Sequence, residues 1–252
     1  MTGSARTPSA WFRVFRPVPD PAFRLLCLPH AGGAANVFAP WPPLLPPQGE
    51  LVAVQYPGRQ NRISEPCVPS IPGLAALIAQ HLPALPGRPL AIFGHSMGAV
   101  VGYEVAARLE QQQGTPVHLL AVSAGSPPHR RPPLPPLPDD AAVLARGRQL
   151  GGFDDRVLGN PDLCELVLPA IRSDMQAVRD YACPRPAKLK APIVAYAGDS
   201  DAEVSLDQLR AWSEVTLSDF ACRLFPGGHF YLDAHASALV SDIVSRIGAV
   251  GS

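Results

Sequence analysis

Short runs of apolar residues alternate with longer stretches of helical periodicity along most of the chain. The apolar runs predict strands at residues 23–28, 51–55, 90–94, 117–124, 192–198 and 221–225. Helical patterns lie between or after these runs, at residues 71–82, 97–113, 206–212 and 236–250. Because the apolar runs are nearly continuous, we expect the strands to be covered on both faces. The pattern predicts an α/β fold, in which helices flank a mostly parallel sheet.

This alternation breaks between about residue 126 and residue 190. The segment opens on SPPHRRPPLPPLPDD, whose prolines are incompatible with a helix interior or a central strand. Two helical patterns follow at residues 139–152 and 161–181, with no predicted strand between them. We interpret the segment as a helical insertion into the α/β core, and such insertions over a site commonly act as lids.

Composition narrows the range of functions. The 252 residues fit one domain, spanning 1–252, that carries the insertion. The 21 basic and 21 acidic residues balance, which disfavours a nucleic-acid partner. No apolar stretch reaches the roughly 18 residues of a membrane span, and none resembles the apolar core of a signal peptide. The five cysteines are scattered without a C-x-x-C pair, which favours a reducing, cytoplasmic location over disulfides or a zinc site.

The sequence Gly94-His95-Ser96-Met97-Gly98 lies between a predicted strand and a predicted helix. It matches G-x-S-x-G, the nucleophile elbow, in which small residues permit a turn so sharp that the serine hydroxyl stands clear of the sheet. A glycine-rich structural turn is the alternative, but the strand before and the helix after favour Ser96 as a nucleophile. We expect His95 to have a structural role.

A serine hydroxyl is a weak nucleophile at neutral pH, so it needs a general base and a group that orients the base. In α/β-hydrolases the acid follows a late strand and the histidine follows the last one. His229 lies behind a Pro-Gly-Gly turn after the last predicted strand and is the candidate base. Both Asp199 and Asp201 follow the strand before it. The G-x-x-D-x-x-V spacing favours Asp201, whereas Asp199 is expected to serve its own loop. Packing or surface roles are expected for His81, His118, His129 and His235.

The oxyanion of a tetrahedral acyl intermediate needs backbone N–H donors. Met97, directly after the candidate nucleophile, is expected to supply one of them. The loop after the first core strand, LPHAGGAA, offers Ala31 as the second, just before two glycines. The chain contains neither G-x-x-x-x-G-K-[ST] nor G-x-G-x-x-G, so no nucleotide cofactor is indicated, and no other cofactor or metal is expected.

Nearly the whole chain resembles the type II thioesterases that accompany modular polyketide synthases and nonribosomal peptide synthetases. The segments that carry the resemblance are LPHAGGAANVF, VQYPGRQNRISEP, IFGHSMGAVVGYEVAARL, LGGF, LVLPAIRSDMQAVRDY, AYAGDSDAEV and FPGGHFYL. The YPGR and PGGHF segments are more discriminating than the elbow. The resemblance implies an α/β-hydrolase fold. It assigns the triad to Ser96, Asp201 and His229, and the oxyanion donors to Ala31 and Met97, in agreement with the choices above.

The resemblance further implies a serine thioesterase that clears acyl groups from the phosphopantetheine arm of carrier proteins. It implies no cofactor, and we expect a monomer. Apolar residues of the insertion, such as Leu166, Leu168 and Ile171, would then line the acyl pocket. The alternatives are a medium-chain fatty acyl-carrier-protein thioesterase, a broad carboxylesterase or lipase, and a non-catalytic binding scaffold. The intact serine, acid and histidine disfavour the scaffold.

Overall fold

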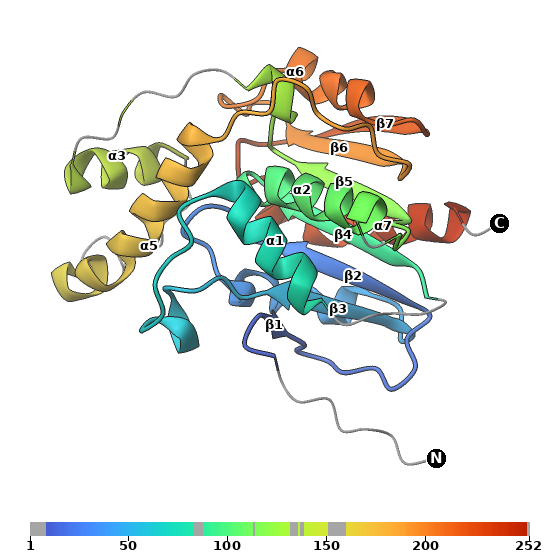
Figure 1. Ribbon diagram of the computed structural model, residues 1–252, viewed down its shortest axis with the longest axis horizontal. Coiled ribbons are helices and arrows are strands. Elements are labelled where there is room, and N and C mark those ends of the chain that lie inside the picture. Colours follow the sequence, from blue (N-terminus) through green and yellow to red (C-terminus); the bar gives the residue numbers. More distant parts are fainter. Residues whose placement is uncertain are drawn as a thin grey trace.

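The computed structural model describes residues 9–82, 88–112, 114–131, 136, 139–150 and 160–250, and within them seven strands form one sheet (Figure 1). The strands are β1 (Phe12–Arg13), β2 (Phe23–Leu28), β3 (Gly49–Val54), β4 (Leu90–His95), β5 (Leu119–Ser123), β6 (Ile193–Gly198) and β7 (Phe220–Phe225). Their order across the sheet is β1-β3-β2-β4-β5-β6-β7. Every neighbouring pair is parallel except β1 with β3. The predicted mostly parallel sheet is therefore confirmed.

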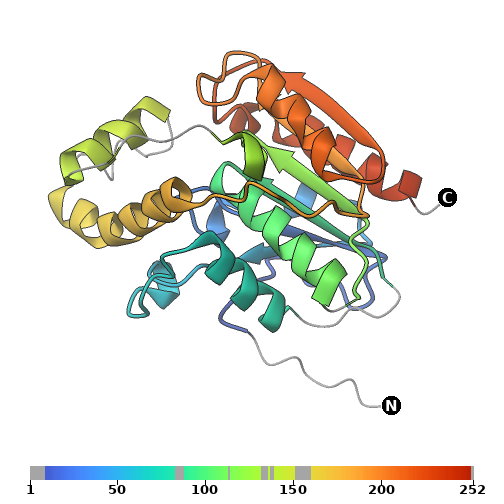
Figure 2. The ribbon, with the colours of Figure 1, turned by 45° about the horizontal axis from the view of Figure 1, so that its top comes forward.

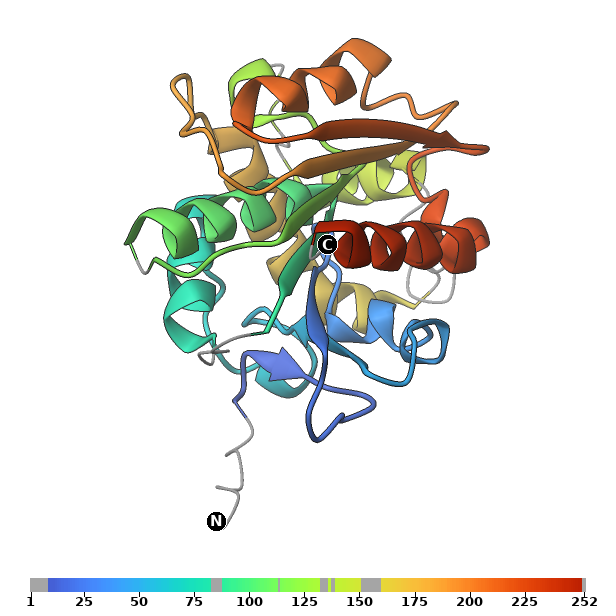
Figure 3. The ribbon, with the colours of Figure 1, turned by 90° about the vertical axis from the view of Figure 1, so that its right-hand side faces the viewer.

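Helices cover both faces of the sheet, and Figure 3 shows α7 (Leu232–Val250) on the side opposite α1 (Ile71–His81) and α2 (Met97–Gln112). Alternate residues of each central strand enter different cores. In β4, Ile92 packs in the core beneath α1 and α2, whereas Phe93 packs in the core beneath α7. Burial on both faces explains why the strands are almost continuously apolar in the sequence.

The structure differs from the sequence-based prediction by one additional strand and at the ends of several elements. The two residues of β1 are too few to show a periodicity, and the sequence did not predict this strand. The predicted helix at 206–212 is α6 (Leu206–Arg210), followed by a 3-10 helix at Ala211–Val215. Helix α7 begins four residues earlier than predicted, because a non-helical residue at His235 divides its first turn from the apolar-periodic part.

Among its described residues, the segment predicted as an insertion forms the α-helices α3 (Asp140–Leu150) and α5 (Pro161–Asp180). They lie side by side at one end of the sheet in Figures 1 and 2. Asn160 caps α5 by accepting hydrogen bonds from the backbone N–H groups of Asp162 and Leu163. Residues 151–153 of the LGGF segment, and the end of the helix predicted at 139–152, lie outside the described residues. Among the helices that the structure describes, none is both long enough and apolar enough to span a membrane.

A single residue, Ser96, separates β4 from α2, and its φ of 56° lies in the left-handed region that non-glycine residues rarely adopt. The flanking glycines permit this turn. A Cβ atom on Gly94 would lie 1.9 Å from the carbonyl oxygen of Gly98. A Cβ atom on Gly98 would lie 2.2 Å from the carbonyl oxygen of Leu28 at the end of β2. Backbone therefore fills both positions, and only glycine fits.

We expect Gly98→Ala to destabilise the protein by about 3 kcal/mol or more, because the new methyl group meets a backbone carbonyl that cannot rotate away. Gly248→Ala is the matched control, since a Cβ atom there has no neighbour within 4 Å. In the helix α7 this control should be neutral or stabilising by up to about 1 kcal/mol. Urea denaturation measures both, and equal stabilities for the two variants would contradict the close approach at Gly98.

Candidate active site

The three residues predicted as a triad come from three separate strand ends. Ser96 follows β4, Asp201 lies in the loop after β6, and His229 lies in the loop after β7. Because β4 to β7 are parallel neighbours, their carboxyl ends share one edge of the sheet, and the structure brings the three side chains together there.

The contacts form one line from the hydroxyl to a buried carboxylate. His229 Nε2 lies 3.0 Å from Ser96 Oγ, and His229 Nδ1 lies 3.0 Å and 3.2 Å from the two carboxylate oxygens of Asp201. The Asp201 side chain is fully buried, and its Oδ1 also accepts a hydrogen bond from the backbone N–H of Glu203 at 2.8 Å. In this geometry the imidazole can take the hydroxyl proton, while the carboxylate orients the ring and stabilises its charged form.

Asp199, the alternative acid, is directed elsewhere. Its Oδ1 accepts a hydrogen bond from the backbone N–H of Gly227 at 3.0 Å, so the side chain ties the β6 loop to the β7 loop. The two loops touch closely, since a Cβ atom on Gly198 would lie 2.1 Å from the carbonyl oxygen of Gly227. Asp199 thus supports the loop that carries His229 without contacting the ring.

The two candidate oxyanion donors come from neighbouring segments. Met97 is the first residue of α2, so its N–H is one of the donors that an α-helix leaves without a partner at its N-terminus. Ala31 lies in the loop after β2, and the carbonyl groups of Leu28 and Pro29 pack against Gly98 of the same helix turn. Among the described residues, neither N–H group donates to a protein acceptor.

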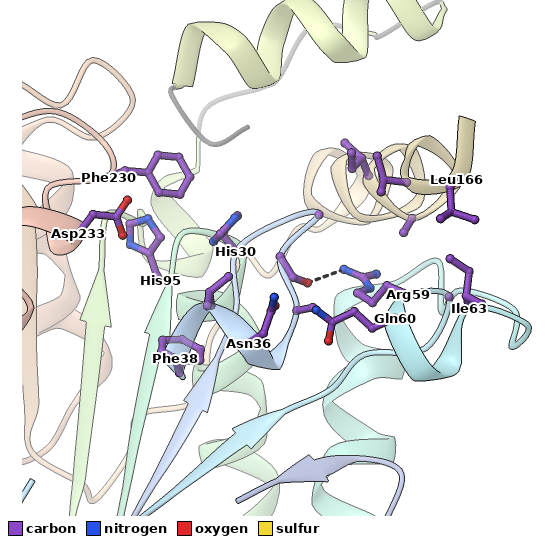
Figure 4. Close-up of a pocket in the computed structure, with 18 of the residues that line it drawn as sticks. His30, Asn36, Phe38, Arg59, Gln60, Ile63, His95, Leu166, Phe230 and Asp233 are labelled. Carbon is purple, nitrogen blue, oxygen red and sulfur yellow. Dashed lines mark hydrogen bonds between the residues drawn. The ribbon is translucent and has the colours of Figure 1, made fainter. Parts of the chain in front are cut away.

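A cluster of aromatic rings surrounds His229. The ring centroid of His95 lies 5.2 Å from that of His229, and His30 lies 6.0 Å from His95 (Figure 4). His95 is buried, and its Nδ1 lies 2.9 Å from Ser123 Oγ, which is 2.7 Å from the Tyr231 hydroxyl. This chain of contacts fixes the His95 ring, which also lines the cavity described below. Nothing in the sequence around His30 had indicated a role for this residue.

A cavity of about 740 Å³ opens beside this cluster, between the strand-end loops and α5 (Figure 4). Its volume lies within the usual range for small-molecule sites, about 300–1,000 Å³. The α5 wall is apolar and consists of Leu166, Val167, Ala170 and Ile171. Two of the three lining residues expected from the sequence, Leu166 and Ile171, do lie there. Leu168 is not a lining residue, because the helical period turns it away from the face that the other four share.

Fold and site together define a serine hydrolase of the α/β class, and comparison with known proteins narrows this class. The chain belongs to the thioesterase family, since the model of the thioesterase domain matches residues 23–247. Over 239 residues it is 43% identical to thioesterase PikA5 of Streptomyces venezuelae, an alignment that covers 94% of this chain and 85% of that protein. The protein is therefore an enzyme that hydrolyses thioesters.

Comparison with solved structures leads to the same family assignment. BorB, the type II thioesterase from the borrelidin biosynthetic cluster, superposes with a TM-score of 0.89 at 38% identity, covering 96% of this chain and 100% of its own. YbtT, a type II thioesterase from the yersiniabactin NRPS/PKS pathway, does so with a TM-score of 0.85 at 30% identity and the same coverage. These matches confirm the predicted α/β-hydrolase fold and the resemblance to type II thioesterases.

The histidine cluster predicts how stability depends on pH. Burial, with smaller contributions from the charges of His229 and Arg59, lowers the pKa of His30 from its ordinary value of 6.5 to about 4. Burial also lowers the pKa of His95, as do His229 and His30. Between these pH values the unfolded chain binds more protons than the folded protein, so stability falls as the pH falls from about 6.5 towards about 4.

We therefore expect the free energy of unfolding to drop over this range, and to drop less steeply in His30→Gln, which has no titrating ring at that position. His81→Gln, at the exposed end of α1, is the control and should retain the wild-type dependence. Denaturant titrations at several pH values measure the slopes. A His30→Gln slope equal to that of wild type would show that the His30 ring is not held neutral.

Proposed function

We propose that this thioesterase removes acyl groups from the phosphopantetheine arm of carrier proteins in polyketide or nonribosomal peptide biosynthesis, as an editing enzyme. The observation that carries the proposal is the hydrogen-bonded line from Ser96 through His229 to the buried Asp201. His95 and Phe230, the chain neighbours of Ser96 and His229, line a cavity whose apolar wall suits an acyl chain. The relatives support the choice of partner, since YbtT is a type II thioesterase of an NRPS/PKS pathway.

In the proposed mechanism, Ser96 Oγ attacks the thioester carbonyl carbon while His229 Nε2 takes the hydroxyl proton. The negative charge that develops on the carbonyl oxygen is stabilised by the N–H groups of Ala31 and Met97. The carbon–sulfur bond then breaks, and the imidazolium returns its proton to the departing sulfur. A water molecule attacks the acyl-enzyme with His229 as the base, which releases the carboxylic acid and restores Ser96.

The proposal also covers the domain organisation, the lid, the location and the oligomeric state of the enzyme. We propose that the chain works as one domain, that residues 126–190 act as a lid over the acyl cavity, and that the enzyme is a cytoplasmic monomer. A medium-chain fatty acyl-carrier-protein thioesterase is the second candidate, because the same cavity wall would also accept an unbranched acyl chain.

We expect Ser96→Ala to lower kcat on an acyl-carrier-protein thioester by about 10⁴-fold, and His229→Ala to lower it comparably, without loss of the fold. The wild-type enzyme should hydrolyse this thioester with a higher kcat/KM than a simple oxygen ester of the same acid. Steady-state kinetics and circular dichroism provide the measurements. Retained activity in Ser96→Ala would refute the nucleophile, and a preference for the oxygen ester would favour a carboxylesterase instead.

The two aspartates of the β6 loop provide a matched pair. Asp201→Asn should lower kcat by about 10⁴-fold, because the amide favours the wrong tautomer of His229. Asp199→Asn keeps an oxygen that can accept from the Gly227 N–H, so its effect on kcat should be small. The same thioester assay compares them, and greater damage from the Asp199 variant would move the acid to that residue.

A further inference from the structure

Helix α5 carries a carboxylate on its buried side. Asp174 is 1% exposed, although it shares the inner face of the helix with the apolar residues Ile171 and Ala177. An ionised carboxylate is stable in such a place only when charged and hydrogen-bonding partners replace the lost water. Asp174 is neither a member of the candidate triad nor one of the candidate oxyanion donors. Its burial on this helix therefore requires another explanation.

The partners of Asp174 come from the two loops that begin at the ends of β2 and β3. Arg59 donates two hydrogen bonds to the carboxylate, from Nη1 to Oδ2 at 2.6 Å and from Nη2 to Oδ1 at 2.9 Å. The backbone N–H of Gly32 donates to Oδ2 at 2.8 Å. Both carboxylate oxygens are therefore satisfied, and one of the three donors belongs to the peptide group that follows Ala31.

Arg59 also holds the same loop directly. Its Nη1 donates to the carbonyl oxygen of Gly33 at 3.0 Å, a bond drawn in Figure 4. The guanidinium lies over the ring of Tyr56, at 5.3 Å from the centroid, and the Tyr56 hydroxyl donates to the carbonyl oxygen of Pro29 at 3.2 Å. Arg59 is 7% exposed, so it contacts this loop with little competition from water.

These contacts surround one peptide group, the one that carries the Ala31 N–H. The preceding peptide is held at the carbonyl of Pro29, and the following one at the N–H of Gly32. The peptide itself is held at its carbonyl, because His30 accepts a hydrogen bond from the Gly33 N–H at 3.0 Å. With its neighbours fixed on both sides, this peptide cannot turn freely, and the direction of the Ala31 N–H is set.

Helix α5 packs directly on the same loop. A Cβ atom on Gly32, whose φ is +76°, would lie 2.8 Å from Cγ1 of Ile171. Ile171 also lines the cavity. The helix that forms the cavity wall therefore supports the backbone of the candidate oxyanion loop through an apolar contact at Ile171 and an ionic contact at Asp174.

We propose that Arg59 and Asp174 are positioning residues that aim the Ala31 N–H at the developing oxyanion and tie that aim to the placement of α5. This inference rests on the proposed function, in which Ala31 supplies an oxyanion donor. The pair acts on the transition state, where the charge develops, more than on the bound thioester.

The test is Asp174→Asn, which keeps the shape of the side chain, removes its charge and leaves Arg59 without a counter-ion. We expect kcat on an acyl thioester to fall by about 10- to 100-fold with little change in KM. This is less than the loss of about 10²- to 10³-fold for a deleted oxyanion donor, because the donor remains but is poorly aimed. Arg59→Lys, which keeps the charge but loses the two-pronged contact, should fall between this variant and wild type.

A trifluoromethyl ketone analogue of the substrate supplies a second measurement, because its adduct with a serine hydroxyl carries an oxyanion. Its affinity should fall in parallel with kcat, whereas a thioether analogue, which has no carbonyl, should bind as in wild type. Glu50→Gln is the matched control. It breaks the buried Arg24–Glu50 ion pair, which lies between β2 and β3 at the strand ends away from the site, and it should lower stability without lowering kcat.

The outcomes separate the possibilities. If Asp174→Asn loses stability as Glu50→Gln does but keeps the wild-type kcat, Arg59 and Asp174 form a structural ion pair only. A rise in KM alone would assign it to the acyl cavity. If Asp174→Asn does not fold, Arg59→Lys decides by the same kinetic criteria. Failure of the proposed function would be recognised separately, because wild type would then not hydrolyse thioesters or Ser96→Ala would remain active.

Discussion

The close approach of α2 to the end of β2 is the constraint on which the rest of the site depends. Gly98 lies so near the carbonyl group of Leu28 that no side chain fits between them. This contact places the N-terminus of α2, with Ser96 and Met97, beside the loop that begins at Pro29. The loops after β6 and β7 place Asp201 and His229 at the same edge of the sheet. One backbone contact between α2 and the end of β2 thus sets where the hydroxyl, its base and both candidate oxyanion donors can meet.

Several polar side chains at this edge are buried and have specific partners. The carboxylate of Asp201 lies beside His229 Nδ1 and accepts a hydrogen bond from the backbone N–H of Glu203. The carboxylate of Asp174 accepts hydrogen bonds from both Nη atoms of Arg59. Burial lowers the pKa of His95, which favours its uncharged form, and one ring nitrogen contacts Ser123. A low-dielectric setting strengthens these contacts and raises the cost of any group left unpaired. These contacts orient the polar groups of the site before a substrate arrives.

The amphipathic helix α5 contributes both to the cavity wall and to the contacts of the loop that carries Ala31. Its apolar residues form one wall of the cavity, and its single buried aspartate reaches the loop beneath. Because Ile171 contacts that loop and also lines the cavity, the placement of the helix affects the acyl-binding volume and the backbone at Ala31 together. A helix inserted between two strands of a hydrolase core can in this way support catalysis as well as enclose the substrate.

The sequence by itself determined the central strands, the main helices and the nucleophile elbow, because periodicity and the G-x-S-x-G pattern are readable within a few neighbouring residues. The contact that requires glycine at Gly98 is long-range, since it is made with Leu28 of β2. Chain order also selected His229, and the G-x-x-D-x-x-V spacing favoured Asp201 over Asp199 as the acid. The tertiary structure shows how the turn directs these two side chains apart, Asp201 towards the ring and Asp199 towards the Gly227 N–H, although a single residue separates them in one loop. The pairing of Arg59 with Asp174, 115 residues away, could not be predicted, although a carboxylate on the apolar face of a helical pattern was a signal that a buried partner exists. Such pairings depend on which strand ends become neighbours in the sheet, and long-range packing sets that order.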